Sequence, residues 1–426
     1  MASIFDDLTW RGLIHQTTAP EQLPGWLASG SRMVYAGFDP TSDSLHVGSL
    51  LPVMLLRRFQ KAGHKPIALV GGATGMIGDP SGKSEERNLL SVDALRANVE
   101  GIGNQLRRFL DFDGPSAAKL LNNFDWVGPF TYLEFLRDVG KHFPVNVMLG
   151  KDSVKNRIER DSGISYTEFS YMLLQAYDFA YLHKTHGCEL QIGGSDQWGN
   201  ITAGIDLARR MHGASLYGMT CPLLLKSDGT KMGKTEKGAI YLSAAKTSPY
   251  TFYQYWINVA DADAGLCLRF LTELSQAEIE ALDQSRTNEP HLRSSQKRLA
   301  EELTRTVHGD GGLDAAKKAT EIFFGAEIEN LNDAQLNDIF ADVPSEEVPR
   351  SRLSDDSFTL VDAILAAKLA NSKSEARRTV DQGGAYINNR RREPFDLKLT
   401  VGDLASETVM VVRAGKKKYG LLKFPA

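Results

Sequence analysis

The feature that most constrains the fold is a strand, a helix and a second strand in close succession near the N-terminus. The run 33–38 is short and apolar, and 65–70 is a second such run with Pro66 at its start. Between them, apolar residues recur at helical spacing from His46 until Gly63 provides a stop signal. Two strands joined by one helix are expected to lie parallel in a sheet with a right-handed crossover.

The same pattern recurs later in the chain. A strand is predicted over 189–192, then a Gly-Gly-Ser-Asp turn and a helix from Gln197 to about Met211, and 222–225 is predicted as a further strand. Repeated units of this kind predict an α/β fold with a doubly wound, Rossmann-like parallel sheet. We expect this domain to span residues 1–242.

The remaining sequence predicts two further domains, in line with a length of 426 residues. Residues 243–342 are helical in period and poor in strand signals. Residues 343–357 are rich in Pro, Ser and charge without periodicity, which favours a linker. Residues 358–426 begin with two predicted helices and end in short strands, which indicates a small α+β domain.

Charge is unevenly distributed along the chain. Residues 358–426 contain 13 Lys and Arg against 7 Asp and Glu, a net charge of +6. Since the whole chain carries −4, the first 357 residues carry −10. An acidic body with a basic end is the asymmetry expected when that end touches an anionic polymer.

Composition excludes several classes of protein. Three widely spaced cysteines rule out a disulfide scaffold and a Cys-rich zinc site. No apolar run is long enough for a membrane helix. The N-terminus carries Asp6 and Asp7 where a signal or transit peptide would carry bases. We therefore expect a cytoplasmic protein with no membrane contact.

Two short motifs indicate phosphate binding. His46-Val47-Gly48-Ser49 opens the first crossover helix, where free N–H groups and the helix dipole attract phosphate oxygens. The alternative is a solvent-exposed capping turn. Lys231-Met-Gly-Lys234-Thr235 follows the predicted strand 222–225 and offers two lysines as a cationic clamp, the alternative being a solvated basic loop. Both motifs fall at the carboxyl ends of strands, where sheets of this type bind nucleotides.

Two other motifs are weaker. The segment 78–84 resembles a P-loop, but its first glycine would have to stand where Ile77 is, so the loop is one residue short. His183, His186 and Cys188 lie within six residues at the end of a predicted helix without a nearby fourth metal ligand. Cationic side chains there are better explained as partners of the helix dipole, and no metal site is predicted.

At this level of detail the chain resembles the bacterial tyrosyl-tRNA synthetases of class I. The first motif is similar to their HIGH signature and the second to KMSKS. Longer matches, in family order, are YAGFDPT at 35–41, GGATGMIGDPSG at 71–82, FSYMLLQAYD at 169–178 and QIGGSDQWGN at 191–200. The chain departs from the signatures at Ser49, Gly233 and Thr235, and Ser49 puts one nucleotide contact in doubt.

A polar stripe on a predicted helix suits an amino-acid pocket. Tyr171, Gln175 and Asp178 share one face of a helix over 167–182 whose other faces are apolar. Such a stripe could also be satisfied by hydrogen bonds inside the core. The resemblance implies that Tyr35 and Asp178 bind the tyrosine hydroxyl. It implies a wider tyrosine-binding set of Tyr35, Gly37, Asp79, Tyr171, Gln175, Asp178 and Gln197.

The resemblance also implies an ATP site and a reaction. Its nucleotide-binding residues would be Asp39, His46, Gly48, Ser49, Gly194, Asp196 and Lys234. Its catalytic, phosphate-contacting residues would be Thr41, His46, Lys83, Arg87, Lys231, Lys234 and Thr235. The tyrosine carboxylate would attack the α-phosphate of ATP to give tyrosyl-adenylate and pyrophosphate, and the tyrosyl group would pass to the 3′ end of tRNA(Tyr). Mg²⁺ would arrive with ATP as substrate, without a protein cage or a tightly bound cofactor.

The basic end resembles the small RNA-binding domain of these synthetases, and 243–342 would be the anticodon-side domain. Three clusters would contact RNA phosphates, unless they only solubilise the surface: Arg377 and Arg378; Arg390, Arg391 and Arg392; and Lys416, Lys417 and Lys418. The family implies a homodimer. Two other functions stay open: activation of tryptophan or another aromatic amino acid, and RNA binding by an inactive synthetase fold.

Overall fold

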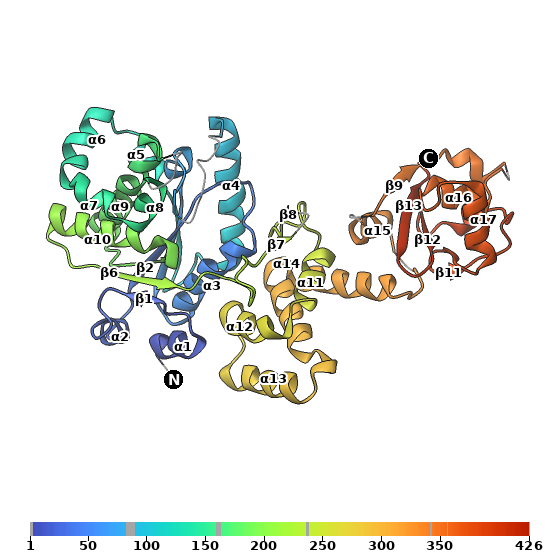
Figure 1. The fold of residues 1–426 in the computed structure, drawn as a ribbon, viewed down its shortest axis with the longest axis horizontal. Coiled ribbons are helices and arrows are strands. Elements are labelled where there is room, and N and C mark those ends of the chain that lie inside the picture. Colours follow the sequence, from blue (N-terminus) through green and yellow to red (C-terminus); the bar gives the residue numbers. More distant parts are fainter. Residues whose placement is uncertain are drawn as a thin grey trace. The chain divides into compact units, whose positions relative to one another are not determined.

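The computed structural model describes residues 3–81, 90–158, 163–235, 238–329, 331–340, 343–355 and 357–425. It divides into two compact units (Figure 1). The first comprises residues 1–246 and 256–307, and the second comprises 247–255 and 308–426. Two helices run across the division, α11 (Pro249–Ile257) and α14 (Ser294–Phe323), and α14 is kinked at Gly309.

The first unit is built on a six-stranded sheet in the order β1-β6-β5-β2-β3-β4. All neighbouring strands are parallel except the edge strand β1, which runs antiparallel to β6. The strands are β1 (Gln16–Thr17), β2 (Met33–Phe38), β3 (Lys65–Val70), β4 (Lys119–Asn122), β5 (Leu190–Gly194) and β6 (Tyr217–Cys221). The predicted α/β class with a mostly parallel sheet is confirmed.

Helices surround this sheet, and a small hairpin follows it in the chain. The helices of the first unit are α1 (Ile4–Arg11), α2 (Leu23–Ala28), α3 (Val47–Lys61), α4 (Val92–Phe109), α5 (Phe124–Val127), α6 (Tyr132–Asp138), α7 (Val145–Leu149), α8 (Asp152–Ile158), α9 (Tyr166–His186), α10 (Trp198–His212), α12 (Asp261–Leu271) and α13 (Gln276–Asn288). The hairpin pairs β7 (Lys234–Thr235) with β8 (Gly238–Ala239).

One predicted strand is wrong. The segment 222–225 is not a strand, because β6 ends at Cys221 and Pro222 has no N–H with which to continue the ladder. The observed strand 217–221 contains Gly218 and Thr220, so its sequence lacks the continuous apolar run that marks β2 and β3. The carboxyl end of β6 therefore lies at Cys221, directly before the segment 222–225 that was predicted as the strand.

Helix α9 follows the prediction but is longer. It ends where Gly187 adopts a left-handed conformation, with φ of 68°, and donates its N–H to the His183 carbonyl. His183 and His186 lie in the last turn, as expected for side chains beside the negative end of the dipole. Among the described residues, no cluster of His, Cys, Asp and Glu is suited to a metal ion.

The second unit contains a five-stranded sheet in the order β11-β10-β12-β13-β9. Its strands are β9 (Ser345–Glu347), β10 (Ala385–Ile387), β11 (Arg390–Arg391), β12 (Val409–Ala414) and β13 (Lys418–Lys423). Its other helices are α15 (Asp333–Ile339), α16 (Leu360–Ala366) and α17 (Lys373–Asp381). Met410 and Val412 pack into one apolar cluster with α16, while Val409 and Val411 pack into another with α15. Strand β12 is thus buried on both faces.

The segment expected to be a linker is part of this unit. Residues 345–347 form β9, which pairs parallel with β13, and Val348 and Leu353 are buried in the cluster with α16. Two buried residues five positions apart give no periodic signal, so the sequence around them predicts neither a helix nor a strand. The domain boundaries drawn from the sequence stay a prediction. None of the helices in the described part of the chain is long and apolar enough to span a membrane.

Candidate functional site

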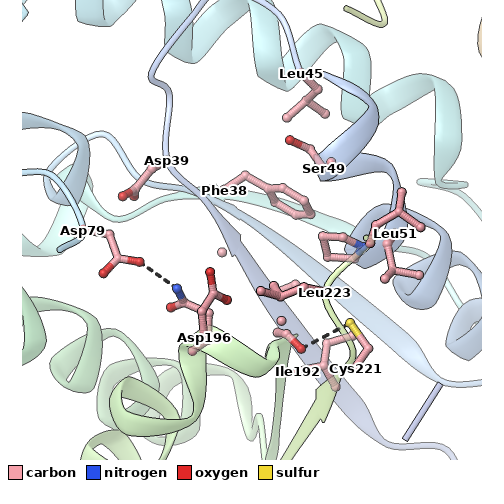
Figure 2. A pocket seen from close by; sticks show the side chains of 18 of the residues that line it. Phe38, Asp39, Leu45, Ser49, Leu51, Asp79, Ile192, Asp196, Cys221 and Leu223 are labelled. Atoms are coloured by element: carbon pink, nitrogen blue, oxygen red, sulfur yellow. Dashed lines mark hydrogen bonds between the residues drawn. The ribbon is translucent and has the colours of Figure 1, made fainter. Parts of the chain in front are cut away.

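A cavity of about 350 Å³ opens at the carboxyl ends of β2 and β5, next to the first turn of α3. Figure 2 shows the carboxylates of Asp39, Asp79 and Asp196 on one side of the cavity and Ser49 across from them. Fifteen of the predicted site residues line it: Tyr35, Gly37, Asp39, His46, Gly48, Ser49, Asp79, Tyr171, Gln175, Asp178, Gly194, Asp196, Gln197, Lys231 and Lys234.

Four of the residues predicted for the tyrosine and ATP sites are not among those lining it. Thr41 and Thr235 lie at the exposed surface, and the hydroxyl of Thr235 donates to the Gly238 carbonyl at 3.0 Å. Lys83 and Arg87, together with the segment that resembles a P-loop, fall outside the described residues, apart from its first four positions. The roles of these four residues therefore rest on the resemblance alone.

Helix α9 presents the predicted polar stripe to the cavity. The Tyr171 hydroxyl donates to Oδ2 of Asp39 at 2.9 Å, and Nε2 of Gln175 donates to Oε1 of Gln197 at 3.1 Å. Nε2 of Gln197 in turn donates to Oδ2 of Asp79 at 2.6 Å (dashed in Figure 2). Tyr171 and Gln175 are therefore joined to residues at the ends of two strands, Asp39 after β2 and Gln197 after β5.

Asp178 is a buried carboxylate with two neutral donors. Its side chain is 2% exposed, Nδ2 of Asn123 donates to it at 3.0 Å and Nε1 of Trp126 at 2.8 Å. Burial raises the pKa of Asp178 to about 7, although the two hydrogen bonds oppose the shift, and Asp39 raises it further. No cation balances the charge within the described residues, so this carboxylate is a strong acceptor for a hydroxyl from a ligand.

Asn123 and Trp126 were missed by the sequence analysis. They follow β4, a short strand that was not predicted because its run Lys-Leu-Leu-Asn is brief and only half apolar. Had β4 been recognised as a parallel strand, Asn123 at its carboxyl end would have been a candidate for the site.

Three buried polar atoms around the cavity lack a hydrogen-bond partner in the described part of the chain. They are Oη of Tyr35, Oε1 of Gln175 and Oε1 of Gln191. Tyr35 on β2 and Gln191 on β5 are directly paired in register, and burial raises the pKa of Tyr35 well above its usual value. An unpaired buried polar atom costs about 1–3 kcal/mol, so these atoms suit a polar ligand. Gln191 was quoted within a motif but not predicted as a site residue.

The opposite side of the cavity holds the first turn of α3. His46 is the N-cap, and its Nδ1 accepts the Gly48 N–H at 3.0 Å. With Nδ1 acting as acceptor, the neutral ring carries its proton on Nε2, which is then a donor for a ligand oxygen. A Cβ at Gly48 would lie 2.8 Å from the His46 ring, so glycine permits this cap.

The two predicted phosphate motifs are joined through one residue. The N–H of Val47 donates to the Ile240 carbonyl at 2.9 Å, and the N–H of Ile240 donates to the Gly233 carbonyl at 2.8 Å. Gly233 has φ of +84°, and a Cβ there would lie 2.7 Å from Cβ of Val47. Glycine, which departs from the KMSKS pattern, is thus the residue that allows this close approach.

The basic clusters of the second unit differ in their partners. Arg390 pairs with Glu327 at 3.0 Å and also with Glu329, Arg391 pairs with Glu393 at 3.3 Å, and Arg392 with Asp403 at 3.1 Å. Arg377 stacks over the Phe395 ring at 4.9 Å. For Arg377, Arg378 and the exposed Lys416, Lys417 and Lys418, no ion pair is found within the described residues.

Because Asp178 is a buried carboxylate, we predict that Asp178→Asn gains stability relative to the wild type as the pH rises. Between pH 4 and pH 7 the folded protein keeps a proton on Asp178 that the unfolded chain has released, so the wild type loses stability as pH rises through this window. Asparagine does not titrate. The free energy of unfolding of D178N relative to the wild type should therefore improve by about 2 kcal/mol from pH 5 to pH 8.

This difference is measured by denaturant unfolding of both proteins without ligand at the two pH values. Titrations common to both proteins cancel in the comparison. A relative stability that stays constant between pH 5 and pH 8 would show that the carboxyl is ionised throughout.

Comparison with known proteins identifies the family. The model of class I tRNA synthetases (W and Y) matches residues 29–325, and that of the tyrosine–tRNA ligase SYY-like C-terminal domain matches 335–422. The tyrosine–tRNA ligase of Rhodopirellula baltica is 59% identical, over 99% of this chain and 96% of its own. That of Roseiflexus castenholzii is 51% identical, over 99% and 100%.

A solved structure agrees. The C-terminally truncated mitochondrial tyrosyl-tRNA synthetase of Aspergillus nidulans superposes with a TM-score of 0.69 at 31% identity, covering 76% of this chain and 95% of its own. Family models, full-length relatives and fold point to the same group, as did the sequence motifs. The chain belongs to the tyrosine–tRNA ligase family of class I tRNA synthetases.

Proposed function

We propose that the chain is a tyrosine–tRNA ligase, which forms tyrosyl-adenylate and pyrophosphate from tyrosine and ATP and then transfers tyrosine to tRNA(Tyr). The observation that carries this function is the buried acceptor Asp178 in a cavity shared with Tyr35, whose hydroxyl has no partner within the described residues. A phenol placed between them pairs both groups. Phenylalanine would leave them unpaired, which is the physical basis for rejecting it.

The stripe on α9 orients the other end of the amino acid. Asp79, Tyr171 and Gln175 provide acceptors for the α-ammonium, and Gln197 links Gln175 to Asp79. Asp39 accepts from Tyr171 and so fixes its ring. The substrate carboxylate is ionised at pH 7 and needs no general base, so its activation depends on alignment with the α-phosphate.

The first turn of α3 and the two lysines suit the phosphates of ATP. Nε2–H of His46 donates, the positive end of the α3 dipole attracts the phosphates, and Lys231 and Lys234 supply further positive charge from the facing loop. These donors stabilise the charge that develops on the departing pyrophosphate. Gly194 and Asp196 at the end of β5, with Ser49, suit the ribose. Mg²⁺ entering with ATP would supply further charge neutralisation.

The amino-acid substrate is tested by ATP–pyrophosphate exchange with tyrosine, phenylalanine and tryptophan, each without tRNA. We expect exchange with tyrosine alone. Tyr35→Phe removes one neutral hydrogen bond of about 1 kcal/mol, so the preference for tyrosine over phenylalanine in kcat/KM should fall about fivefold.

Exchange with tryptophan in place of tyrosine would indicate that the chain activates tryptophan. Silence with all three amino acids, in a protein that still binds tRNA, would indicate an inactive synthetase fold acting as an RNA-binding protein.

We also propose that the enzyme is a homodimer. Large apolar side chains are exposed along 124–166, and the most exposed is Leu133 on α6, at 75%. Val145 and Val147 on α7 and Tyr132 on α6 are exposed as well, and the Tyr132 hydroxyl lies 3.2 Å from that of Tyr166. Apolar exposure of this extent is typical of surfaces that a second copy covers.

Sedimentation velocity tests the dimer. The wild type should sediment with twice the mass of one chain, and Leu133→Asp should shift it to the monomer because a charge enters an apolar interface. Leu292→Asp is the matched control, since Leu292 is an exposed leucine outside the segment. A wild type that is monomeric at high concentration would contradict the proposal.

The basic clusters are proposed to contact tRNA phosphates unequally. Arg377, Arg378, Lys416, Lys417 and Lys418 are exposed, whereas the arginines at 390–392 have carboxylate partners in the protein. Breaking those ion pairs offsets what a phosphate contact would gain. We therefore assign the main contacts to α17 and to the turn before β13.

Filter binding of tRNA(Tyr) at a series of salt concentrations tests this assignment. The double variant K416A/K417A should lower the slope of log affinity against log salt by about 2, one unit for each phosphate that the protein no longer neutralises. Arg390→Ala should leave the slope unchanged. A decrease of about 1 in Arg390→Ala, the full amount for one phosphate contact, would show that the internal ion pairs do not matter.

The remaining assignments complete the proposal. Residues 1–242 would carry the adenylation chemistry, 243–342 would approach the anticodon side of the tRNA, and 358–426 would hold the tRNA by its phosphates. The three cysteines are free and buried, which suits the reducing cytoplasm. Burial raises the pKa of all three thiols, so they stay protonated and unreactive.

A further inference from the structure

The loop 226–235, which carries Lys231 and Lys234, is attached to helix α12 at its first turn. Oδ1 of Asp263 accepts the backbone N–H of Ser227 at 2.7 Å. Asp263 is buried, although it lies in the first turn of a helix where acidic residues are usually solvated. Its carboxylate therefore caps a loop N–H group where the loop begins.

A second attachment lies one helical turn further along α12. The Sγ of Cys267 lies 3.2 Å from the Sδ of Met232, and both side chains are buried. Burial raises the pKa of the Cys267 thiol, so its proton stays available for this contact. Met232 stands directly after Lys231, so the contact anchors the loop next to the first lysine.

The far end of α12 is fixed to the core of the first unit. The Arg269 carbonyl and the Leu274 carbonyl accept from Arg11 at 3.1 and 2.7 Å. Arg58 of α3 donates to the Thr272 carbonyl. Because α3 also begins with the His46 motif, α12 is tied to the helix that forms the other side of the ATP cleft.

We propose that α12 is the platform that holds the loop 226–235 in place, with Asp263 and Cys267 as positioning residues for Lys231 and Lys234. Neither residue lines the cavity. The inference rests on the proposed role of the two lysines in ATP activation. It predicts that loss of an attachment weakens the ATP-dependent step and leaves tyrosine binding intact.

Pyrophosphate exchange and tyrosine binding without ATP separate these effects. In Asp263→Ala, kcat/KM for ATP should fall about tenfold, as for loss of one hydrogen bond to a charged group, while the Kd for tyrosine should stay within about twofold. Asp263→Asn keeps an Oδ1 acceptor and should restore exchange to near the wild-type level. Cys267→Ala should show the same pattern as D263A, more weakly.

Asp261→Ala is the matched control. Asp261 lies in the same first turn of α12 but accepts from Gln296 instead of the loop. D261A should leave kcat/KM for ATP unchanged. An equal loss in D261A and D263A, or a loss of tyrosine affinity in D263A that matches the loss toward ATP, would overturn the proposal.

Limited trypsin digestion measures how firmly the loop 226–235 is attached, independently of catalysis. Cleavage after Lys226 and Lys231 should be faster in D263A than in the wild type or D261A. Unchanged cleavage rates in D263A would overturn the proposal even if exchange fell. If the proposed function itself failed, no protein would catalyse exchange, yet the cleavage rates would still report the attachment.

Discussion

The structure depends on the parallel register of β2 with its two neighbours. Pairing of β2 with β3 and with β5 brings three carboxyl ends to one edge of the sheet. Residues far apart in the chain, such as Tyr35 and Gln191, become neighbours there without any loop having to reach across. Helix α3 must begin at the same edge because it is the crossover between β2 and β3, so the positive end of its dipole also faces the cavity.

The cavity buries polar groups, which lowers the stability of the fold, and some of its donors and acceptors lack hydrogen-bond partners within the described residues. Asp178 is buried and has Asn123 and Trp126 as donors, yet within the described residues it has no cation. The hydroxyl of Tyr35 lacks a partner there as well. The protein thus accepts a less stable pocket when empty, and the proposed pairing of both groups with a phenol would recover that stability. Selectivity and binding energy have the same physical origin.

The parts that the sequence predicted well are those with strong local signals. The bounds of β2 and β3 follow from continuous apolar runs, and the core of α9 from its periodicity, although the helix continues beyond the predicted end at residue 182. The polar stripe on α9 could be predicted from the sequence because a helix fixes which residues share a face. Strand β6, with Gly218 and Thr220, and strand β4, only four residues long, carry weak signals because their pairing partners define them.

Other features depend on long-range contacts that no local pattern encodes. In the sequence, the arginine cluster 390–392 looks available for RNA. In the structure, Arg390 is already paired with carboxylates more than 60 positions away in the chain. The attachment of Ser227 to Asp263 is of the same kind. Local sequence shows which side chains carry charge, and only the fold shows how much of that charge is already balanced.

The two-sided burial of β12 has a consequence for how the basic domain can change over time. Positions 409–412 have no solvent face and tolerate neither polar substitutions nor a shift of register, whereas the buried Arg413 lies over the Tyr386 ring. The lysines of the turn after β12 are exposed and touch neither apolar cluster. The lysines proposed to meet RNA therefore lie outside the strand that holds the domain together. Substitutions among these lysines would then change the affinity for tRNA while the core stays fixed.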